Sequence, residues 1–127
     1  MIVGIGTDII AVSRVEAACV RRGDALAERL LHPDELPLQR ASNAPARWLA
    51  KRFAAKEALL KALGTGLRAG LSWHDMAVLP DALGRPQVTW YGAGAARLAQ
   101  FGPCRTHVSI TDERDYVVAF AIIESGG

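Results

Sequence analysis

The chain has 127 residues, of which 50% are hydrophobic and 22% are charged. This size and composition are typical of one soluble globular domain. No apolar run approaches the roughly 20 residues of a membrane-spanning helix, and the first residues lack the basic and apolar regions of a secretory signal. The two cysteines, Cys19 and Cys104, are too isolated for a disulfide framework or a zinc site. We therefore expect a single domain over residues 1–127 that works in the cytoplasm without a membrane partner.

Charge is distributed unevenly along the chain. The net charge is only +2, yet the segment 41–72 contains six basic residues and a single acid, Glu57. The rest of the chain contains nine basic and twelve acidic residues. A basic segment on a mildly acidic background indicates an anionic partner that binds locally.

The first part of the chain predicts one strand and two short helices. Residues 2–5 have the apolar character of a short strand, which we expect to end at Gly6, before Thr7 and Asp8. Ser13 and Glu16 form a capping-box pattern that predicts a helix over 14–22. Asp24 is a suitable N-cap for a second helix that continues through residue 31.

The middle of the chain contains the longest helical signal. Residues 32–45 include three prolines and predict a loop. A helix over 46–63 follows, with Pro45 at its start and Gly64 as its expected C-terminal cap.

The last part of the chain alternates in a way that is typical of strands. The expected elements are strands over 76–79 and 87–91 joined by a hairpin-type loop, a helix over 93–100, and strands over 106–110 and 116–123. The whole order predicts a small α+β domain, with a largely antiparallel sheet packed against the long central helix.

Charged residues in the central helix lie between apolar ones. At about 100° per residue, Glu57 and Lys61 lie one turn apart on one edge, and Arg52 and Lys56 lie one turn apart on another. Apolar residues flank both pairs, and charges in such a setting are costly unless they are paired or used. The pattern indicates either a surface helix with an ordinary Glu57–Lys61 pair or a helix whose charges point into a binding cleft.

Two carboxylates have a setting that fits a metal–phosphate complex. Asp8 follows a strand and two glycines, and Glu57 lies among six bases. Mg²⁺ is typically held by one or two carboxylates together with substrate phosphates and waters. Asp8 and Glu57 are therefore candidate metal ligands, while a turn or cap role for Asp8 is the alternative.

Two other patterns argue against familiar catalytic motifs. The glycines of Gly64-Thr65-Gly66 follow the C-terminal end of a helix, where the dipole disfavours anions, whereas a phosphate-binding P-loop precedes a helix. We expect these glycines to cap the helix, with any phosphate contact made by Lys61 or by loop amides. His107 and Ser109 share one face of a strand, a spacing that favours a polar strand surface over a catalytic pair.

Four motifs resemble those of the holo-acyl-carrier-protein synthase family, which are phosphopantetheinyl transferases. Residues 52–66 are the most specific match, with the letters RFAAKEALLKALGTG against the family pattern F-x-x-K-E-A-x-x-K-A-x-G-T-G. The other three are weaker alone and occur in family order: GIGTDI at 4–9 followed by Arg14, GRP at 84–86, and HVSITD at 107–112.

The resemblance implies a small α+β fold and a homotrimer with active sites between subunits. It also implies coenzyme A as substrate, Mg²⁺ as cofactor and an acidic acyl carrier protein as partner. The implied reaction transfers 4′-phosphopantetheine from coenzyme A to a carrier serine and releases 3′,5′-ADP, in support of fatty acid biosynthesis.

The resemblance also assigns roles to residues of this chain. Asp8 and Glu57 become metal ligands, and Lys61 contacts the diphosphate. The reaction also needs a base for the serine proton, and we expect Glu57 to take it directly or through a metal-bound water. Further residues are expected to contact coenzyme A or the carrier protein: Arg52 and His107 at the ADP end, Lys56, Gly64 and Thr65 elsewhere on coenzyme A, and Arg14 and Arg21 on the carrier. Asp112 departs from the family pattern, because many relatives have histidine there, so no role is carried over to it.

Two non-catalytic alternatives use the basic helix 46–63. One is a nucleic-acid-binding module, for which Glu57 would weaken the phosphate contacts, so we expect no nucleic-acid partner. The other is a protein that binds coenzyme A without transferring any group, and turnover with an apo carrier protein distinguishes it from an enzyme.

Overall fold

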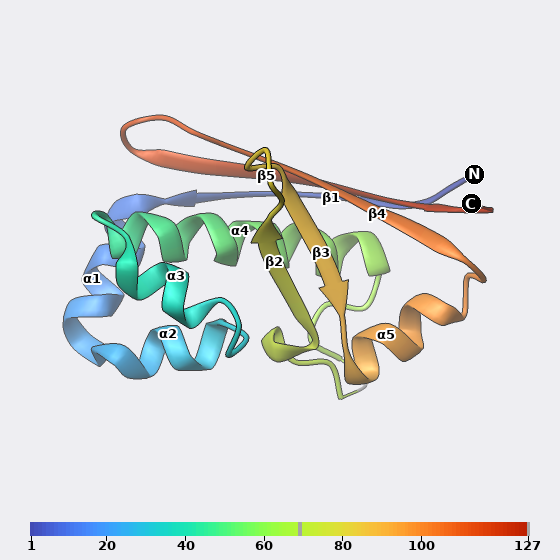
Figure 1. Ribbon diagram of the computed structural model, residues 1–127, viewed down its shortest axis with the longest axis horizontal. Coiled ribbons are helices and arrows are strands. Elements are labelled where there is room, and N and C mark those ends of the chain that lie inside the picture. The colour runs from blue at the N-terminus through green and yellow to red at the C-terminus, as the bar shows by residue number, and fades with distance from the viewer. Residues whose placement is uncertain (69, 127) are drawn as a thin grey trace.

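The computed structural model, which describes residues 1–68 and 70–126, places a long helix, α4 (Pro45–Leu63), beneath a three-stranded sheet (Figure 1). The sheet has the order β1-β5-β4 and every pairing in it is antiparallel. Its strands are β1 (Ile2–Ala11), β4 (Cys104–Asp112) and β5 (Tyr116–Ser125). This arrangement confirms the predicted α+β class and the central position of the long helix.

The remaining elements pack around α4 in two groups (Figure 1). The first group is helical and comprises α1 (Val12–Arg22), α2 (Asp24–Leu30) and α3 (Leu36–Ala41). The second group comprises the short 3-10 helix η1 (Trp73–Asp75), the antiparallel hairpin of β2 (Met76–Pro80) and β3 (Pro86–Trp90), and α5 (Gly92–Ala99). None of the helices in the described part of the chain is long and apolar enough to cross a membrane.

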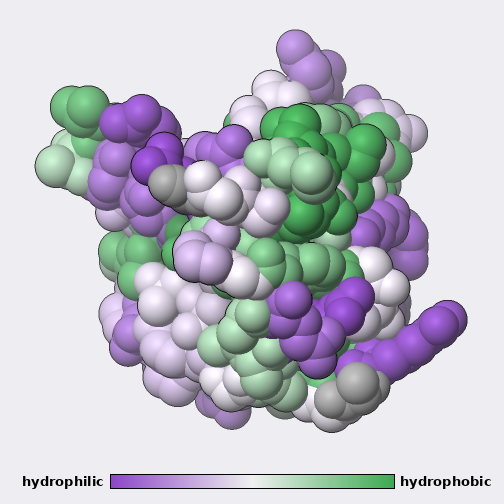
Figure 2. Space-filling model, turned by 90° about the vertical axis from the view of Figure 1, so that its right-hand side faces the viewer, coloured by the Kyte–Doolittle hydropathy of each residue, from purple (hydrophilic) through white to green (hydrophobic). Residues whose placement is uncertain are grey.

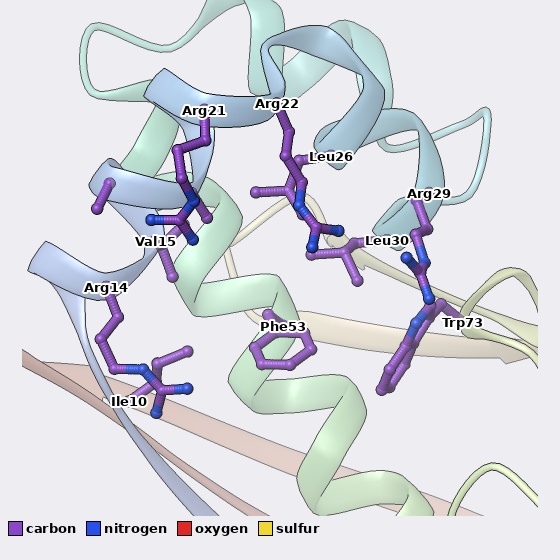
Figure 3. A pocket seen from close by; sticks show the side chains of 12 residues that line it. Ile10, Arg14, Val15, Arg21, Arg22, Leu26, Arg29, Leu30, Phe53 and Trp73 are labelled. Atoms are coloured by element: carbon purple, nitrogen blue, oxygen red, sulfur yellow. The ribbon is translucent and has the colours of Figure 1, made fainter.

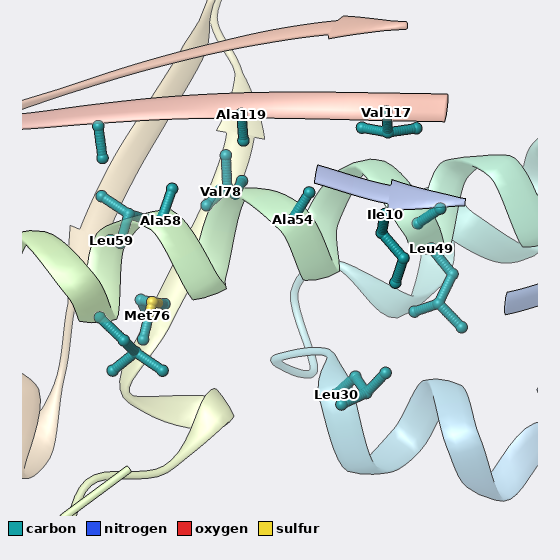
Figure 4. Packing of buried hydrophobic residues seen from close by; sticks show 14 of the residues in the cluster. Ile10, Leu30, Leu49, Ala54, Ala58, Leu59, Met76, Val78, Val117 and Ala119 are labelled. Atoms are coloured by element: carbon teal, nitrogen blue, oxygen red, sulfur yellow. The ribbon is translucent and has the colours of Figure 1, made fainter. Parts of the chain in front are cut away.

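Helix α4 is buried on nearly all sides because small residues line it. Its alanines at positions 50, 54, 55, 58 and 62 are at most 3% exposed. Figure 4 shows Ala54 and Ala58 directed toward Val117 and Ala119 of β5, with Met76 on the opposite side of the helix. Small side chains on the sheet side let α4 approach the sheet closely, so the helix forms the centre of the hydrophobic core.

Strand β1 lies on α4 through two glycines. A Cβ atom at Gly4 would lie 1.8 Å from the carbonyl oxygen of Ala62, and one at Gly6 would lie 1.9 Å from that of Ala58. Distances this short are not compatible with any side chain at either position. Because side chains alternate along a strand, Asp8 points toward α4 from the same face as these glycines.

Several boundaries differ from the sequence-based expectations. Strand β1 continues to Ala11 and so includes Asp8 in its interior instead of ending at Gly6. The capping box at Ser13 does not form, because α1 begins directly after β1 with Ala11 as its N-cap and no side-chain cap. The expected loop 32–45 contains the short helix α3. The prediction that Gly64 caps α4 is confirmed, with φ of 82°.

Replacing Gly6 with alanine should destabilise the fold by about 3 kcal/mol or more, the upper part of the range for overpacking. The new Cβ would push β1 away from α4 at the carbonyl oxygen of Ala58. Urea unfolding followed by circular dichroism measures the change. Gly102→Ala is the matched control, because Gly102 has φ of 81° and no atom within 4 Å of the built Cβ, so only about 1–2 kcal/mol of backbone strain is expected there. Equal losses in the two variants would contradict the steric argument.

Candidate active site

The structure brings Asp8, Glu57 and Lys61 together where β1 crosses α4. The ammonium of Lys61 donates to Asp8 Oδ1 at 3.3 Å and to the carbonyl oxygen of Thr7 at 2.9 Å. Glu57 lies one turn before Lys61 on α4. The side chain of Asp8 is 18% exposed and that of Lys61 is 53% exposed, so the cluster is partly buried but open to solvent.

The carboxylates of Asp8 and Glu57 repel each other when both are ionised. Partial burial raises the pKa of Glu57, the negative charge of Asp8 raises it further, and Lys61 acts in the opposite direction. Two carboxylates held this close favour a bound cation or a proton. The site therefore has the electrostatic character of a cation-binding or acid–base site.

Two carboxylates suit Mg²⁺, which needs few protein ligands, better than a metal ion whose ligands all come from the protein. Within residues 1–68 and 70–126, no group of three or more His, Cys, Asp or Glu side chains is gathered in a way that could hold a metal ion. A cation at Asp8 and Glu57 would have to complete its shell with phosphate oxygens and waters, which is the usual arrangement for Mg²⁺.

The turn after α4 is arranged for helix capping. The backbone N–H of Gly64 donates to the carbonyl oxygens of Leu60 at 3.2 Å and Lys61 at 3.0 Å, so this N–H is not free for a phosphate. The Thr65 hydroxyl donates to Gly66 O at 3.2 Å. No sequence motif pointed to Arg97, whose guanidinium donates to the carbonyl oxygen of Leu63 at 3.1 Å. Arg97 thus places a cation at the negative end of the helix.

Lys56 does not belong to this site, and the expectation that it contacts coenzyme A does not agree with its position. Its side chain is 0% exposed and its ammonium is bonded to Glu35 and to two backbone carbonyls. A helical projection does not distinguish a charge that points into a cleft from one that points into the core. Glu35, the partner that settles the question, lies in the segment that was expected to be a loop.

Arg52 lines a separate cavity of about 330 Å³ on another side of α4. Its guanidinium lies over the ring of Trp48 at 4.3 Å, and its Nε is buried without a hydrogen-bond partner in the described part of the chain. The other lining residues come from α4, the β2–β3 hairpin and β4: Lys51, Pro80, Gly84, Pro86 and Ile110. Lys61 lies nine positions after Arg52, about 13.5 Å along the helix, so one chain does not place them side by side.

His107 lies on the outer face of the sheet, which points away from α4. Its Nε2 bonds to Glu124 Oε1 at 2.9 Å, and this contact lowers the pKa of the Glu124 carboxyl. The hydrogen bond directs the imidazole toward β5 and not toward Ser109. The polar-surface interpretation of these residues therefore agrees with the structure.

A groove beside the cluster is rimmed by four arginines. It has a volume of about 600 Å³ and lies between α1, α2, α4 and η1. Arg14 and Arg21 both line it, together with Arg22 and Arg29, to which no sequence motif pointed (Figure 3). The floor is apolar and consists of Ile10, Val15, Leu26, Leu30, Phe53 and Trp73. A surface of this kind suits an acidic partner with an apolar anchor.

The groove and the two carboxylates share the elements β1 and α4. Ile10 follows Asp8 on the inward face of β1, and Phe53 precedes Glu57 by one turn of α4. The ring of Phe53 packs edge-on against that of Trp73, with centroids 5.4 Å apart. A partner that fills the groove would thus bring its surface beside Asp8 and Glu57.

Asp112, the residue that departs from the family pattern, connects the β4–β5 hairpin to α4. Its carboxylate accepts from Arg47 at 2.9 Å and forms an ion pair with Lys51 at 3.3 Å. Arg47 also donates to the carbonyl oxygens of Glu113 and Arg114 at 2.8 and 2.6 Å. These contacts attach the β4–β5 hairpin to the first turns of α4.

Comparison with known proteins agrees with this geometry. The 4′-phosphopantetheinyl transferase superfamily matches residues 4–121. A holo-[acyl-carrier-protein] synthase of Shewanella denitrificans is 49% identical over 124 residues, covering 98% of each chain. The crystal structure of holo-[acyl-carrier-protein] synthase from Neisseria meningitidis has a TM-score of 0.90 and 42% identity, and covers 98% of this chain and 100% of its own.

A second solved structure adds a ligand. It is a holo-(acyl-carrier-protein) synthase from Bacillus anthracis in complex with CoA (3′,5′-ADP), with a TM-score of 0.81 and 33% identity over 99% of each chain. Motifs, fold and near-complete coverage agree, and the chain belongs to the 4′-phosphopantetheinyl transferase superfamily, in the holo-acyl-carrier-protein synthase family that its motifs resemble.

Proposed function

We propose that this chain transfers the 4′-phosphopantetheine group from coenzyme A to a serine of an apo acyl carrier protein in the cytoplasm, in support of fatty acid biosynthesis. The observation that carries the proposal is the position of Asp8, Glu57 and Lys61 beside the arginine-rimmed groove. Relatives named holo-[acyl-carrier-protein] synthase, one of them described in complex with CoA, support the same reaction. The comparisons support neither the nucleic-acid-binding alternative nor the non-catalytic one.

The chemistry follows from the charges at the site. The serine oxygen attacks the β-phosphorus, the phosphorus–oxygen bond to 3′,5′-ADP breaks, and the serine proton passes to Glu57 directly or through a water. In the metal-free site, burial and Asp8 raise the pKa of Glu57, a direction that suits a general base. Lys61 places its ammonium where negative charge grows on the leaving group. Mg²⁺ held by Asp8 and Glu57 would polarise the diphosphate and offset its charge.

The arginine groove is the proposed docking site for the carrier. Arg14 and Arg21 lie on one wall of the groove, where opposite charge would steer an acidic carrier protein and fix its orientation. The apolar floor would then bury a side chain of the carrier next to the two carboxylates. Docking in this position accounts for how the serine reaches Glu57.

We further propose a homotrimer with active sites between subunits. Apolar side chains on β1 and β5 point away from α4 and are exposed, among them Ile5 at 59%, Ile9 at 62% and Phe120 at 43%. Hydrophobic residues gather at the height of the sheet in Figure 2, and patches of this kind mark association surfaces. Assembly through this face would bring His107 near a neighbour's site.

Sedimentation equilibrium tests the trimer. A molar mass of one chain would contradict it.

The transfer itself is tested by mass spectrometry. Apo acyl carrier protein incubated with this chain, coenzyme A and Mg²⁺ should gain the mass of one phosphopantetheine, and EDTA should stop the gain. Asp8→Ala should nearly abolish it while the circular dichroism spectrum stays unchanged, because one of the two proposed metal ligands is lost. No mass gain with the wild-type chain would overturn the function. Unchanged turnover of Asp8→Ala at limiting Mg²⁺ would remove Asp8 from the metal shell.

Lys61→Met separates catalysis from helix stability. If Lys61 stabilises the leaving group, kcat/KM for coenzyme A should fall roughly a hundredfold, the scale of a lost transition-state contact. The melting temperature should change little, because an exposed ion pair contributes about 1 kcal/mol or less. Arg40→Met is the matched control, since the Arg40 side chain is 54% exposed and pairs with Glu28 at 3.4 Å. A stability loss in Lys61→Met with full activity would contradict the catalytic role.

Glu57→Gln should stabilise the metal-free protein at neutral pH. Burial and Asp8 raise the pKa of Glu57 in the folded state, so its ionisation opposes folding above that pKa, and glutamine removes the penalty. The gain in melting temperature should shrink as the pH falls toward about 4.3, the ordinary pKa of glutamate. Thermal unfolding in EDTA between pH 4 and 8 measures this effect, with Glu113→Gln on the exposed hairpin as control. A lower melting temperature for Glu57→Gln at pH 7 would refute the electrostatic argument.

A further inference from the structure

Lys56 is the largest fully buried side chain among the described residues. Its ammonium contacts Glu35 Oε1 at 2.6 Å and donates to the carbonyl oxygens of Leu30 and Trp73, each at 2.9 Å. An ammonium has three N–H donors, and here each of them has a partner. Such a group is costly to bury, so a reason other than stability is needed for its position.

The carboxylate of Glu35 completes the arrangement. Oε1 accepts from the backbone N–H of His32 at 2.8 Å, and Oε2 accepts from the backbone N–H of Val78 at 2.8 Å. The pair thus connects α4, the end of α2, the segment before α3, η1 and β2 at one buried point. An apolar side chain would fill this space but would form no hydrogen bonds. The Lys56–Glu35 pair bonds to four backbone groups and so fixes their orientation: the carbonyls of Leu30 and Trp73 and the N–H groups of His32 and Val78.

Two of these backbone groups belong to the arginine groove. Leu30 and Trp73 both line it, and Phe53, which also lines it, precedes Lys56 by three residues on α4. Arg29 on the rim is the chain neighbour of Leu30. The bonds of Lys56 therefore hold Leu30 on the α2 side of the groove and Trp73 on its η1 side at a fixed spacing from Phe53 on α4.

We propose that Lys56, neutralised by Glu35, is a positioning residue for carrier-protein docking: it holds the α2 and η1 sides of the arginine groove in register with Phe53. The inference rests on the proposed function, because it assigns the groove to the carrier. Lys56 contacts neither coenzyme A nor the reacting atoms. Its removal should alter recognition of the carrier and leave recognition of coenzyme A unchanged.

The test uses Lys56→Met/Glu35→Gln, because Lys56→Met alone leaves a buried carboxylate without its cation and risks misfolding. The double variant carries no buried charge at this point, and the introduced glutamine retains one carbonyl acceptor. Steady-state kinetics well below the melting temperature should show a KM for the carrier raised at least about fivefold, with the KM for coenzyme A within about twofold of wild type. The Kd for a carrier with its serine replaced by alanine should rise by a similar factor.

Two controls make the outcome specific. Leu98→Ala removes a partly buried core side chain of α5, at the opposite end of the molecule (Figure 1), and should lower the melting temperature without changing either KM. Arg14→Glu tests the groove itself and should raise the KM for the carrier alone. If Arg14→Glu has this effect and the double variant keeps a wild-type KM, the positioning role is wrong and docking stands. If Arg14→Glu leaves the carrier KM unchanged, the docking site itself is wrong. Equal increases in both KM values of the double variant would also overturn the positioning role.

Discussion

The contact on which the rest of this structure depends is the crossing of β1 over α4 at Gly4 and Gly6. Each glycine leaves room for a helix carbonyl that lies within 2 Å of where a Cβ would be. That spacing brings the next inward residue, Asp8, to the edge of α4 beside Glu57 and Lys61. The same strand carries Ile10 into the floor of the arginine groove. A single steric constraint thus positions both the proposed chemistry and the proposed docking surface.

Ion pairs at two levels of burial then fix α4 within the fold. Near its first turns, Arg47 and Lys51 reach Asp112 at the edge of the sheet. On a side of α4 that faces the core, the ammonium of Lys56 contacts the carboxylate of Glu35. The Asp112 pairs are partly exposed and attach a hairpin, whereas the Lys56 pair is fully buried and connects the helical layer to β2. Charged residues of α4 therefore lie in three separate settings. Arg47 and Lys51 attach the β4–β5 hairpin, Lys56 connects the helical layer to β2, and Glu57 and Lys61 belong to the candidate active site.

The sequence was sufficient for the fold class, the long helix and most strand pairs, because period and turn residues are local signals. It did not determine the length of β1, since Thr7 and Asp8 resemble a turn until the antiparallel register with β5 extends the strand past them. The proximity of Asp8 to Glu57 came from family resemblance and required the tertiary structure. The burial of Lys56 was not predicted, because its partner Glu35 lies in a segment without helical periodicity. The four arginines of the groove come from two helices, and only their packing brings them together.

The pairing of β1 with β5 has a consequence for the order of folding. Thr7 donates to the carbonyl oxygen of Ala119, 112 residues later, and the amino group of Met1 donates to Ser125. Contacts between such distant segments close a large loop, which slows folding because the entropy of the intervening chain is lost first. During synthesis, α1 to α4 exist before the central strand of the sheet does, so β1 has no hydrogen-bonding partner on its β5 edge, and the alanine face of α4 lacks the cover of that strand, until β5 has been made. The strand pairing that holds Thr7 and Asp8 in β1 therefore forms only in the last stage of synthesis.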